Sequence, residues 1–291
     1  QIIGLPKLLG TRYDHVLIFH ANKDIRRVLP WVRCSSIWSH QQVTYIPPGC
    51  DAAPQLPGVP SNQIVRFEKP VHGILRRMAM LEKIQIASNG THMDIFLNNN
   101  DRAEVLLFLK QHRIMPKEFI YLNVGGSIPK KQWPVDKCIS LAKLVLQNTS
   151  LAIVLGGGPE DTDRVDSIEK QLDRQRVARA THRPLRANCA LIAQARMLIT
   201  PDSGPMHVGF ALKIPTIALF YSMDKQGQNR NELNGPEYCG PLEIGKDLCA
   251  VMWDNFQDTK KEGDPGHFVP NPILVSEVWE KVQDFLKLKT E

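Results

Sequence analysis

The second half of the chain alternates short apolar runs with segments of helical periodicity, and no other feature constrains the fold as strongly. The apolar runs lie at residues 119–124, 151–155, 197–199 and 215–220. Between them, apolar residues recur every three or four positions, which is the period of an amphipathic helix. Strands that are apolar throughout and alternate with helices are typical of a parallel sheet covered on both faces. We therefore predict a doubly wound α/β domain over residues 115–270.

The preceding part of the chain is less regular, and we assign residues 1–114 to a separate α/β domain. A final amphipathic helix within residues 271–291 is expected to pack back on that first domain. In the first domain we expect strands at 14–19, 43–46, 64–67 and 93–97, and helices at 25–32, at 71–87 and from the capping residue Asp101 onward.

Composition and charge limit the classes of function. The 291 residues are 43% hydrophobic and 23% charged, as in folded globular proteins. No apolar run approaches the ~20 residues that cross a bilayer, so we expect a cytoplasmic protein. The six cysteines lack the paired spacing of a zinc or redox site. The net charge of +6 suits an acidic small molecule or an anionic membrane face, whereas the dispersed basic residues do not predict nucleic-acid binding.

The first candidate loop follows the predicted strand at 119–124. Two glycines at positions 125 and 126 allow a close approach of backbone to a ligand, Ser127 offers a hydroxyl group, and Lys130 or Lys131 offers positive charge to a phosphate. The alternative interpretation is a flexible turn with solvated lysines.

The second candidate loop, residues 156–161, follows the next predicted strand. Its sequence is neither the dinucleotide fingerprint nor a P-loop. Glu160 is a candidate for accepting hydrogen bonds from a ribose or sugar hydroxyl. Alternatively, this carboxylate stabilises the positive end of the following helix dipole.

The third candidate loop lies between the predicted strands at 197–199 and 215–220. Ser203 and Gly204 open a helix whose first-turn N–H groups could hold a diphosphate, and His207 adds a donor one turn later. Phosphate would repel Asp202, so we assign Asp202 to hydroxyl contacts or to fixing the loop. Helix capping by Ser203 or Asp202 and a packed His207 are the alternatives.

These loops together predict a nucleotide-diphosphate pocket without a metal ion, in which a lysine and a helix dipole stabilise the leaving diphosphate. Three sequence motifs also match a known family in order and spacing. They are Lys-Gln-Trp-Pro at 131–134, Gly-Pro-Glu at 158–160 and Asp-Ser-Gly-Pro-Met-His at 202–207. On these motifs the chain resembles glycosyltransferase family 9, the bacterial lipopolysaccharide core heptosyltransferases. The similarity is strongest over residues 117–225.

This resemblance implies the GT-B fold, with two Rossmann-like domains facing a cleft. It also implies an inverting, metal-independent transfer of heptose, or a related sugar, from an ADP-sugar to a lipopolysaccharide inner-core acceptor. The implied partners are this donor, a lipid-anchored saccharide and the cytoplasmic face of the inner membrane, and no cofactor is expected. The implied contacts are Ser127 and Lys131 with the diphosphate, Glu160 with the nucleoside, and Asp202, Ser203, Gly204 and His207 with the sugar-diphosphate.

The chain also departs from the family pattern. The family's opening strand and Gly-Asp loop, which carries the expected general base, do not precede Tyr13. We therefore expect an incomplete N-terminal domain and assign no residue as the base; either the sequence is a fragment or this member lacks the base. A nucleotide-sugar-binding protein without transferase activity and another GT-B enzyme, such as a nucleotide-sugar epimerase, are the alternatives.

Overall fold

The computed structural model divides into two compact units. One unit contains Gln1–Thr91 and Glu232–Cys239, and the other contains His92–Asn231 and Gly240–Glu291. The residues that the structure describes are 5–19, 23–42, 59–69, 71–126, 129–220, 235–242, 248–253, 256–258, 268–270 and 273–287.

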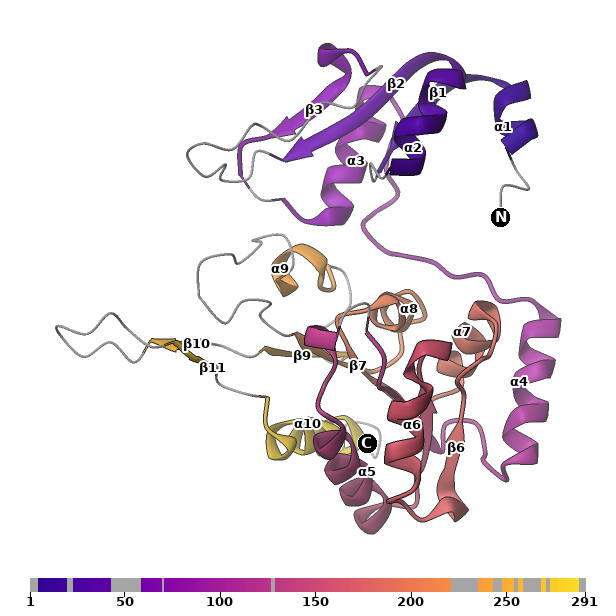
Figure 1. The fold of residues 1–291 in the computed structure, drawn as a ribbon, viewed down its shortest axis with the longest axis vertical. Helices are drawn as coiled ribbons and strands as arrows, with labels where there is room; N and C mark the ends of the chain where they lie inside the picture. The colour runs from indigo at the N-terminus through magenta and orange to yellow at the C-terminus, as the bar shows by residue number, and fades with distance from the viewer. Residues whose placement is uncertain are drawn as a thin grey trace. The chain divides into compact units, whose positions relative to one another are not determined.

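A parallel sheet forms the centre of the second unit (Figure 1). Within the described residues its strand order is β6-β5-β4-β7-β8-β9, so the chain winds outward from β4 in one direction and then from β7 in the other. Ligands bind beside such a switch point in open α/β sheets. The strands are β4 (Phe119–Asn123), β5 (Ala152–Gly156), β6 (Val177–Arg179), β7 (Met197–Pro201), β8 (Thr216–Phe220) and β9 (Cys249–Trp253).

Alternate side chains of these strands enter two hydrophobic cores, because successive residues of a strand point to opposite faces. Ile120 and Leu122 of β4 join one core, whereas Phe119 and Tyr121 join the other. The first core contains α5 (Val135–Asn148), α6 (Thr162–Glu169) and α10 (Val275–Lys287), and the second contains α4 (Asn99–Gln111), α7 (Leu185–Ala193) and α8 (Gly204–Ala211). This two-sided burial explains why the strands are predominantly apolar.

The start of the second unit differs in detail from the sequence expectations. Residues 93–97, expected as a strand, form no regular element. The helix α4 that follows is capped by Asn98, and Asp101 completes a capping box as the third helical residue. Residues 92–114 cluster with the second unit. The closing helix α10 packs on α5 and β8 of that same unit.

The first unit contains a smaller parallel sheet in the order β1-β2-β3. Its middle strand, β2 (Arg33–Gln42), escaped the sequence prediction because its residues are mostly polar and half exposed. The strand expected at 43–46 lies outside the described residues. The remaining elements of this unit are β1 (Arg12–Ile18), β3 (Ile64–Phe67), α1 (Leu5–Gly10), α2 (Lys23–Val28), α3 (Gly73–Lys83) and α9 (Pro236–Cys239).

An antiparallel pair, β10 (Phe256–Asp258) and β11 (Phe268–Pro270), completes the regular structure. Among the described residues, no helix is both long enough and apolar enough to cross a membrane.

Candidate functional site

The loops after β4 and β7 meet at the switch point of the second unit, and Asn123 connects them. This residue ends β4 and is buried. Its side-chain amide donates to the carbonyl of Gly125 at 3.1 Å, to the hydroxyl of Thr200 at 3.0 Å and to the hydroxyl of Ser203 at 3.2 Å. The buried amide therefore fixes one loop against the other. Asn123 was not among the predicted site residues, because a single polar residue at the end of an apolar run is a weak signal.

An ion pair joins the same two loops. Lys131 Nζ donates to Asp202 Oδ2 at 2.5 Å, and the two side chains are 15% and 10% exposed. The sequence predicted both residues for the site without predicting that they pair. This ion pair ties the two loops together and holds the lysine ammonium at the switch point.

Trp133 anchors the segment that presents Lys131. Its side chain is fully buried in the first core. Arg164 of α6 donates to the backbone carbonyls of Trp133, at 2.6 Å, and Val124, at 3.3 Å. The tryptophan of the Lys-Gln-Trp-Pro motif therefore has a structural role, since it positions the lysine two residues before it.

The start of α8 lies directly after this ion pair in the sequence. Ser203 occupies the N-cap position, but its side chain makes no capping hydrogen bond; its hydroxyl instead donates to the carbonyl of Pro201 at 3.1 Å. Gly204 is exposed, and a Cβ atom built on it would meet no heavy atom within 4 Å. The positive end of the helix dipole thus faces open space at this position.

His207 lies one turn into α8 and is half-buried. Its ring packs edge-on against Phe210, with 6.2 Å between the ring centroids. The structure therefore places Asp202, Ser203, Gly204 and His207 on one strand-to-helix turn beside Lys131. Ser127, which was also predicted for the site, lies outside the described residues.

The loop after β5 is organised by Asp161, which directly follows the predicted ligand contact Glu160. Asp161 is 2% exposed and accepts hydrogen bonds from the backbone N–H of Gly158, at 2.9 Å, and from the Gln132 amide, at 3.1 Å. Glu160 is exposed beside it. Gln132 belongs to the Lys-Gln-Trp-Pro motif, so Asp161 ties the second loop to the first.

Gly125 is required by this same carboxylate. A Cβ atom built on Gly125 would lie 2.0 Å from Asp161 Oδ2, which is far inside van der Waals contact. The glycine was expected to allow the close approach of a ligand, whereas in the structure the Asp161 side chain makes the close approach.

The expectation of a site without a metal ion rested in part on the absence of an Asp-x-Asp triplet, which was wrong, because Asp161-Thr162-Asp163 is such a triplet. Asp161 is buried and hydrogen-bonded inside the loop, whereas Asp163 is exposed on α6. In the part of the chain that the structure describes, no group of three or more His, Cys, Asp or Glu residues is arranged to hold a metal ion.

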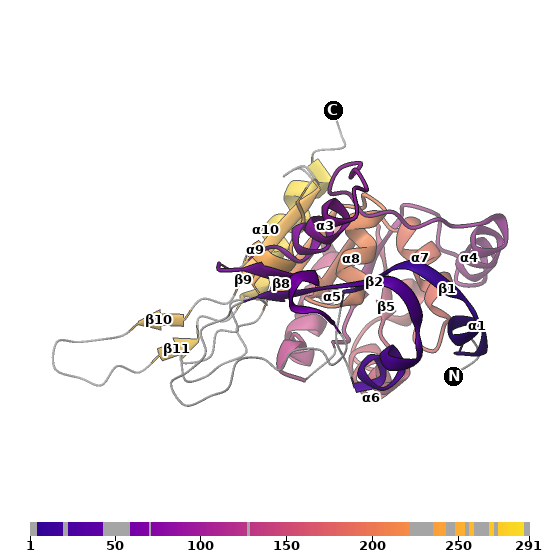
Figure 2. The same ribbon diagram turned by 90° about the horizontal axis from the view of Figure 1, so that it is seen from above.

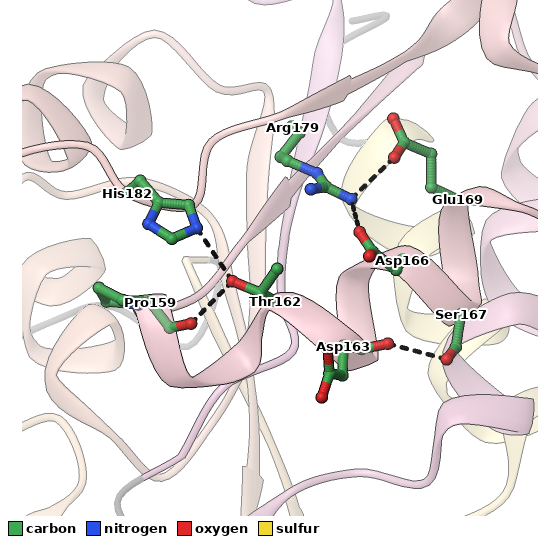
Figure 3. Close-up of polar contacts among 8 residues, drawn as sticks. All are labelled: Pro159, Thr162, Asp163, Asp166, Ser167, Glu169, Arg179 and His182. Carbon is green, nitrogen blue, oxygen red and sulfur yellow. Dashed lines mark hydrogen bonds and ion pairs between the residues drawn. The ribbon is translucent and has the colours of Figure 1, made fainter.

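A third connection links the loops after β5 and β6 (Figure 3). The Thr162 hydroxyl donates to the carbonyl of Pro159 at 2.7 Å and lies 2.9 Å from Nε2 of His182. The residue before His182 is Thr181, whose buried hydroxyl group has no hydrogen-bond partner among the described residues. The edge of the sheet beyond β5 therefore carries polar groups that sequence reasoning did not select.

Figure 3 also shows an ion-pair group farther along α6. Arg179 of β6 pairs with Asp166 and, at 2.9 Å, with Glu169. The Asp166 carboxylate hydrogen-bonded to it raises the pKa of Arg179. This group fastens α6 to the sheet.

Comparison of the structure with solved proteins defines the class of fold. The structure is similar to that of a glycosyltransferase family 9 protein from Veillonella parvula, with a TM-score of 0.71 and 20% sequence identity. The superposition covers 99% of this chain and 79% of the Veillonella chain. It is also similar to the ADP-heptose lps heptosyltransferase II of E. coli, with a TM-score of 0.69 and 17% sequence identity. That superposition covers 99% of this chain and 80% of the E. coli chain. The predicted GT-B class, with Rossmann-like α/β domains, is confirmed.

Comparison of the sequence then defines the family. The profile of glycosyltransferase family 9 (heptosyltransferase) matches residues 59–229. A lipooligosaccharide heptosyltransferase 2 from Campylobacter jejuni is 27% identical over 123 residues, which are 40% of this chain and 39% of that relative. The match therefore spans about two fifths of the length of this curated relative. The chain belongs to glycosyltransferase family 9, as its three motifs predicted.

Proposed function

We propose that this protein transfers heptose, or a related sugar, from an ADP-sugar to a lipopolysaccharide inner-core acceptor. Family membership supports sugar transfer, and the similar E. coli protein is an ADP-heptose lps heptosyltransferase. The observation that carries the proposal is the Lys131–Asp202 pair, held at the switch point beside the start of α8. An anionic ligand bound at this position would contact both the Lys131 ammonium group and the positive end of the α8 dipole.

The donor's diphosphate would lie between Lys131 and the first turn of α8. In this proposal Lys131 shares its hydrogen bonding between Asp202 and a phosphate oxygen. A Cβ atom built on Gly204 would meet no heavy atom within 4 Å, which leaves room for the diphosphate at the start of α8. Ser127, Ser203 and His207 add neutral or cationic donors to the same group.

Asp202 and Glu160 accept hydrogen bonds from the hydroxyl groups of the donor in this proposal. The Asp202 carboxylate, shielded from water, keeps Lys131 in position and accepts from a sugar hydroxyl. The exposed Glu160 accepts from the ribose, next to the loop that Asp161 holds in place.

The proposed reaction inverts the anomeric centre. An acceptor oxygen attacks the anomeric carbon, the bond from that carbon to the phosphate oxygen breaks, and ADP leaves with the bonding electrons. Lys131 and the α8 dipole stabilise the negative charge that grows on the diphosphate, which is the part of the work that other enzymes assign to a metal ion. The acceptor's proton passes to a base, for which we assign no residue.

Nucleotide selectivity and product analysis test the proposal together. ADP should raise the melting temperature more than UDP or GDP at equal concentration, since only a ligand of the native state stabilises it. With ADP-heptose and a deacylated, soluble inner-core acceptor, mass spectrometry should detect an acceptor one heptose heavier and an equal amount of ADP. No thermal shift with any of the three nucleotides would refute the site. A shift without transfer would favour a binding protein, and an epimerised donor without transfer would favour an epimerase.

A further inference from the structure

The hydroxyl group of Ser203 has three polar neighbours inside the protein. Ser203 directly precedes α8, which lies beside α7 in the second unit (Figures 1 and 2). Its hydroxyl oxygen is 3.2 Å from the amide nitrogen of Asn123 and 3.2 Å from the hydroxyl oxygen of Thr200. The carbonyl oxygen of Pro201 is 3.1 Å away. A hydroxyl group has a single hydrogen to donate. The partner that takes this hydrogen therefore decides what Ser203 offers a ligand.

The side chain of Asn123 can act only as a donor toward Ser203. The amide nitrogen of Asn123 lies 3.1 Å from the carbonyl of Gly125, which is only an acceptor, so the nitrogen and not the amide oxygen faces the two loops. The same nitrogen lies 3.0 Å from the Thr200 hydroxyl. Asn123 is 4% exposed, so these contacts are shielded from water. The Ser203 oxygen is therefore an acceptor for Asn123, and its own hydrogen goes to another partner.

That hydrogen can leave the Pro201 carbonyl without leaving a buried acceptor unpaired. The hydroxyl of Thr200 also donates to the Pro201 carbonyl, at 2.9 Å, and Thr200 is fully buried. An unpaired buried carbonyl would destabilise the loop. Because Thr200 keeps this carbonyl paired, the Ser203 hydroxyl can turn to a ligand at little cost.

The helix α8 does not need the Ser203 hydroxyl as a cap either. A serine at the N-cap usually accepts from the N–H of the second or third helical residue. The second residue here is Pro205, which has no N–H. The N–H of the third, Met206, donates to the backbone carbonyl of Ser203 at 3.1 Å. The fold therefore leaves the Ser203 hydroxyl available for a ligand at the start of α8.

We propose that Asn123 is a positioning residue for donor binding. Its amide holds the Ser203 oxygen at the start of α8, so that the hydroxyl hydrogen turns from Pro201 to a phosphate oxygen when the diphosphate binds. Thr200 keeps the Pro201 carbonyl paired during this change. A hydroxyl group that accepts a hydrogen bond also donates a stronger one. This inference rests on the proposed function, because it needs a diphosphate at the start of α8.

The ratio of the adenosine Kd to the ADP Kd, measured by titration calorimetry, tests this role. Only ADP carries phosphates, so a general loss of structure does not lower the ratio selectively. We expect Ser203→Ala to lower it about tenfold, as for the loss of a hydrogen bond to a charged group. Asn123→Ala should lower it by a similar factor. The variant with both substitutions should lose little more than either single variant, because Asn123 acts through Ser203.

A second variant, Thr200→Val, tests the same arrangement and leaves the Asn123 amide in place. Without the Thr200 hydroxyl, the Pro201 carbonyl keeps the Ser203 hydrogen. The ratio should therefore fall about fivefold, and it should not fall further when Thr200→Val is added to Ser203→Ala. Valine is similar in shape to threonine, so this variant decides the question if Asn123→Ala does not fold.

Thr216→Val is the matched control, because it removes a buried hydroxyl from β8 of the same sheet. This hydroxyl donates to the carbonyl of Ile214 at 2.7 Å. The control should lower stability and leave the ratio unchanged. An unchanged ratio in Asn123→Ala, losses that multiply in the double variant, or an equal loss in Thr216→Val would overturn the positioning role and leave the proposed function standing. A wild type that binds ADP no more tightly than adenosine would refute both.

Discussion

Two cation–carboxylate groups of the second unit use similar chemistry in different places. Lys131 and Asp202 join the loops after β4 and β7, with side chains 15% and 10% exposed. Arg179 joins β6 to Asp166 and Glu169 on α6, with side chains between 25% and 39% exposed. The first pair lies at the switch point beside a helix start, whereas the second lies at the edge of the sheet. Position in the topology, and not the type of pair, therefore distinguishes the proposed ligand-binding cation, Lys131, from the structural cation, Arg179.

Replacing the switch-point lysine should have the largest effect. We expect Lys131→Ala to lower kcat for heptose transfer by about 100-fold or more, because a preorganised group that stabilises the leaving charge typically contributes that much. Initial rates of ADP release at saturating acceptor measure the effect. Lys143→Ala on α5 is the matched control and should retain full activity. Wild-type rates for Lys131→Ala would remove this residue from the site.

A larger side chain at Gly125, in the loop that carries Lys131, should have the next largest effect, which is a loss of stability. We expect Gly125→Ala to lower the free energy of unfolding by about 2 kcal/mol, because the new methyl group would lie 2.0 Å from Asp161 Oδ2. Gly204→Ala is the matched control, since a Cβ atom there meets no heavy atom within 4 Å. Urea unfolding of both variants measures the difference. Similar stabilities would show that Asp161 does not hold the loop as described.

The strands of the switch point could be predicted because both of their faces are buried. A run such as β8 (Thr216–Phe220) is buried throughout and apolar after its first residue, so it is conspicuous in the sequence. The strand β2 (Arg33–Gln42) was missed because polar residues on a half-exposed strand resemble a loop. The strand expected at 93–97 was wrong, since these residues have an apolar pattern but no neighbouring strand to pair with in the structure.

The candidate site could be predicted where a motif placed chemistry at a strand end, as for Lys131 and Asp202. The structural role of Asp161, next to the candidate Glu160, was not predicted, because burial depends on contacts that are distant in the sequence. The buried Asp161 accepts a hydrogen bond from Gln132, which lies 29 positions earlier in the sequence. The role of Asn123 was hidden for the same reason, because its partner Thr200 is 77 positions away.

Removing the cation at the sheet edge should have a smaller effect than either change above. We expect Arg179→Ala to lower the free energy of unfolding by less than about 1 kcal/mol, since partly exposed ion pairs are screened by water. ADP should bind the variant as it binds the wild type. Chemical unfolding and titration calorimetry measure the two quantities. A loss of ADP affinity would show that the edge group takes part in ligand binding and would end the distinction between the two groups.

A third pair, Asp101 with Arg186, should have the smallest effect, and this effect should disappear in acid. The hydrogen bond from Arg186 lowers the pKa of Asp101. The Asp101 carboxylate is therefore protonated more readily in the unfolded chain than in the folded protein. The stability that the ion pair contributes is fully present above the unfolded pKa of about 3.9, and it is lost as the pH falls through the lower pKa of the folded state. We expect Asp101→Asn to melt below the wild type at pH 6 and to converge with it below pH 3. A constant difference across this range would contradict the ionic account.

Titration of ADP and adenosine into the wild type and Lys131→Ala tests the central claim, that the diphosphate binds at the switch point, most directly. ADP should bind the wild type far more tightly than adenosine, because adenosine lacks the phosphates. In Lys131→Ala the affinity for ADP should fall at least tenfold, whereas the affinity for adenosine should stay the same, since the nucleoside contacts lie elsewhere. An unchanged ratio of the two affinities would contradict the claim.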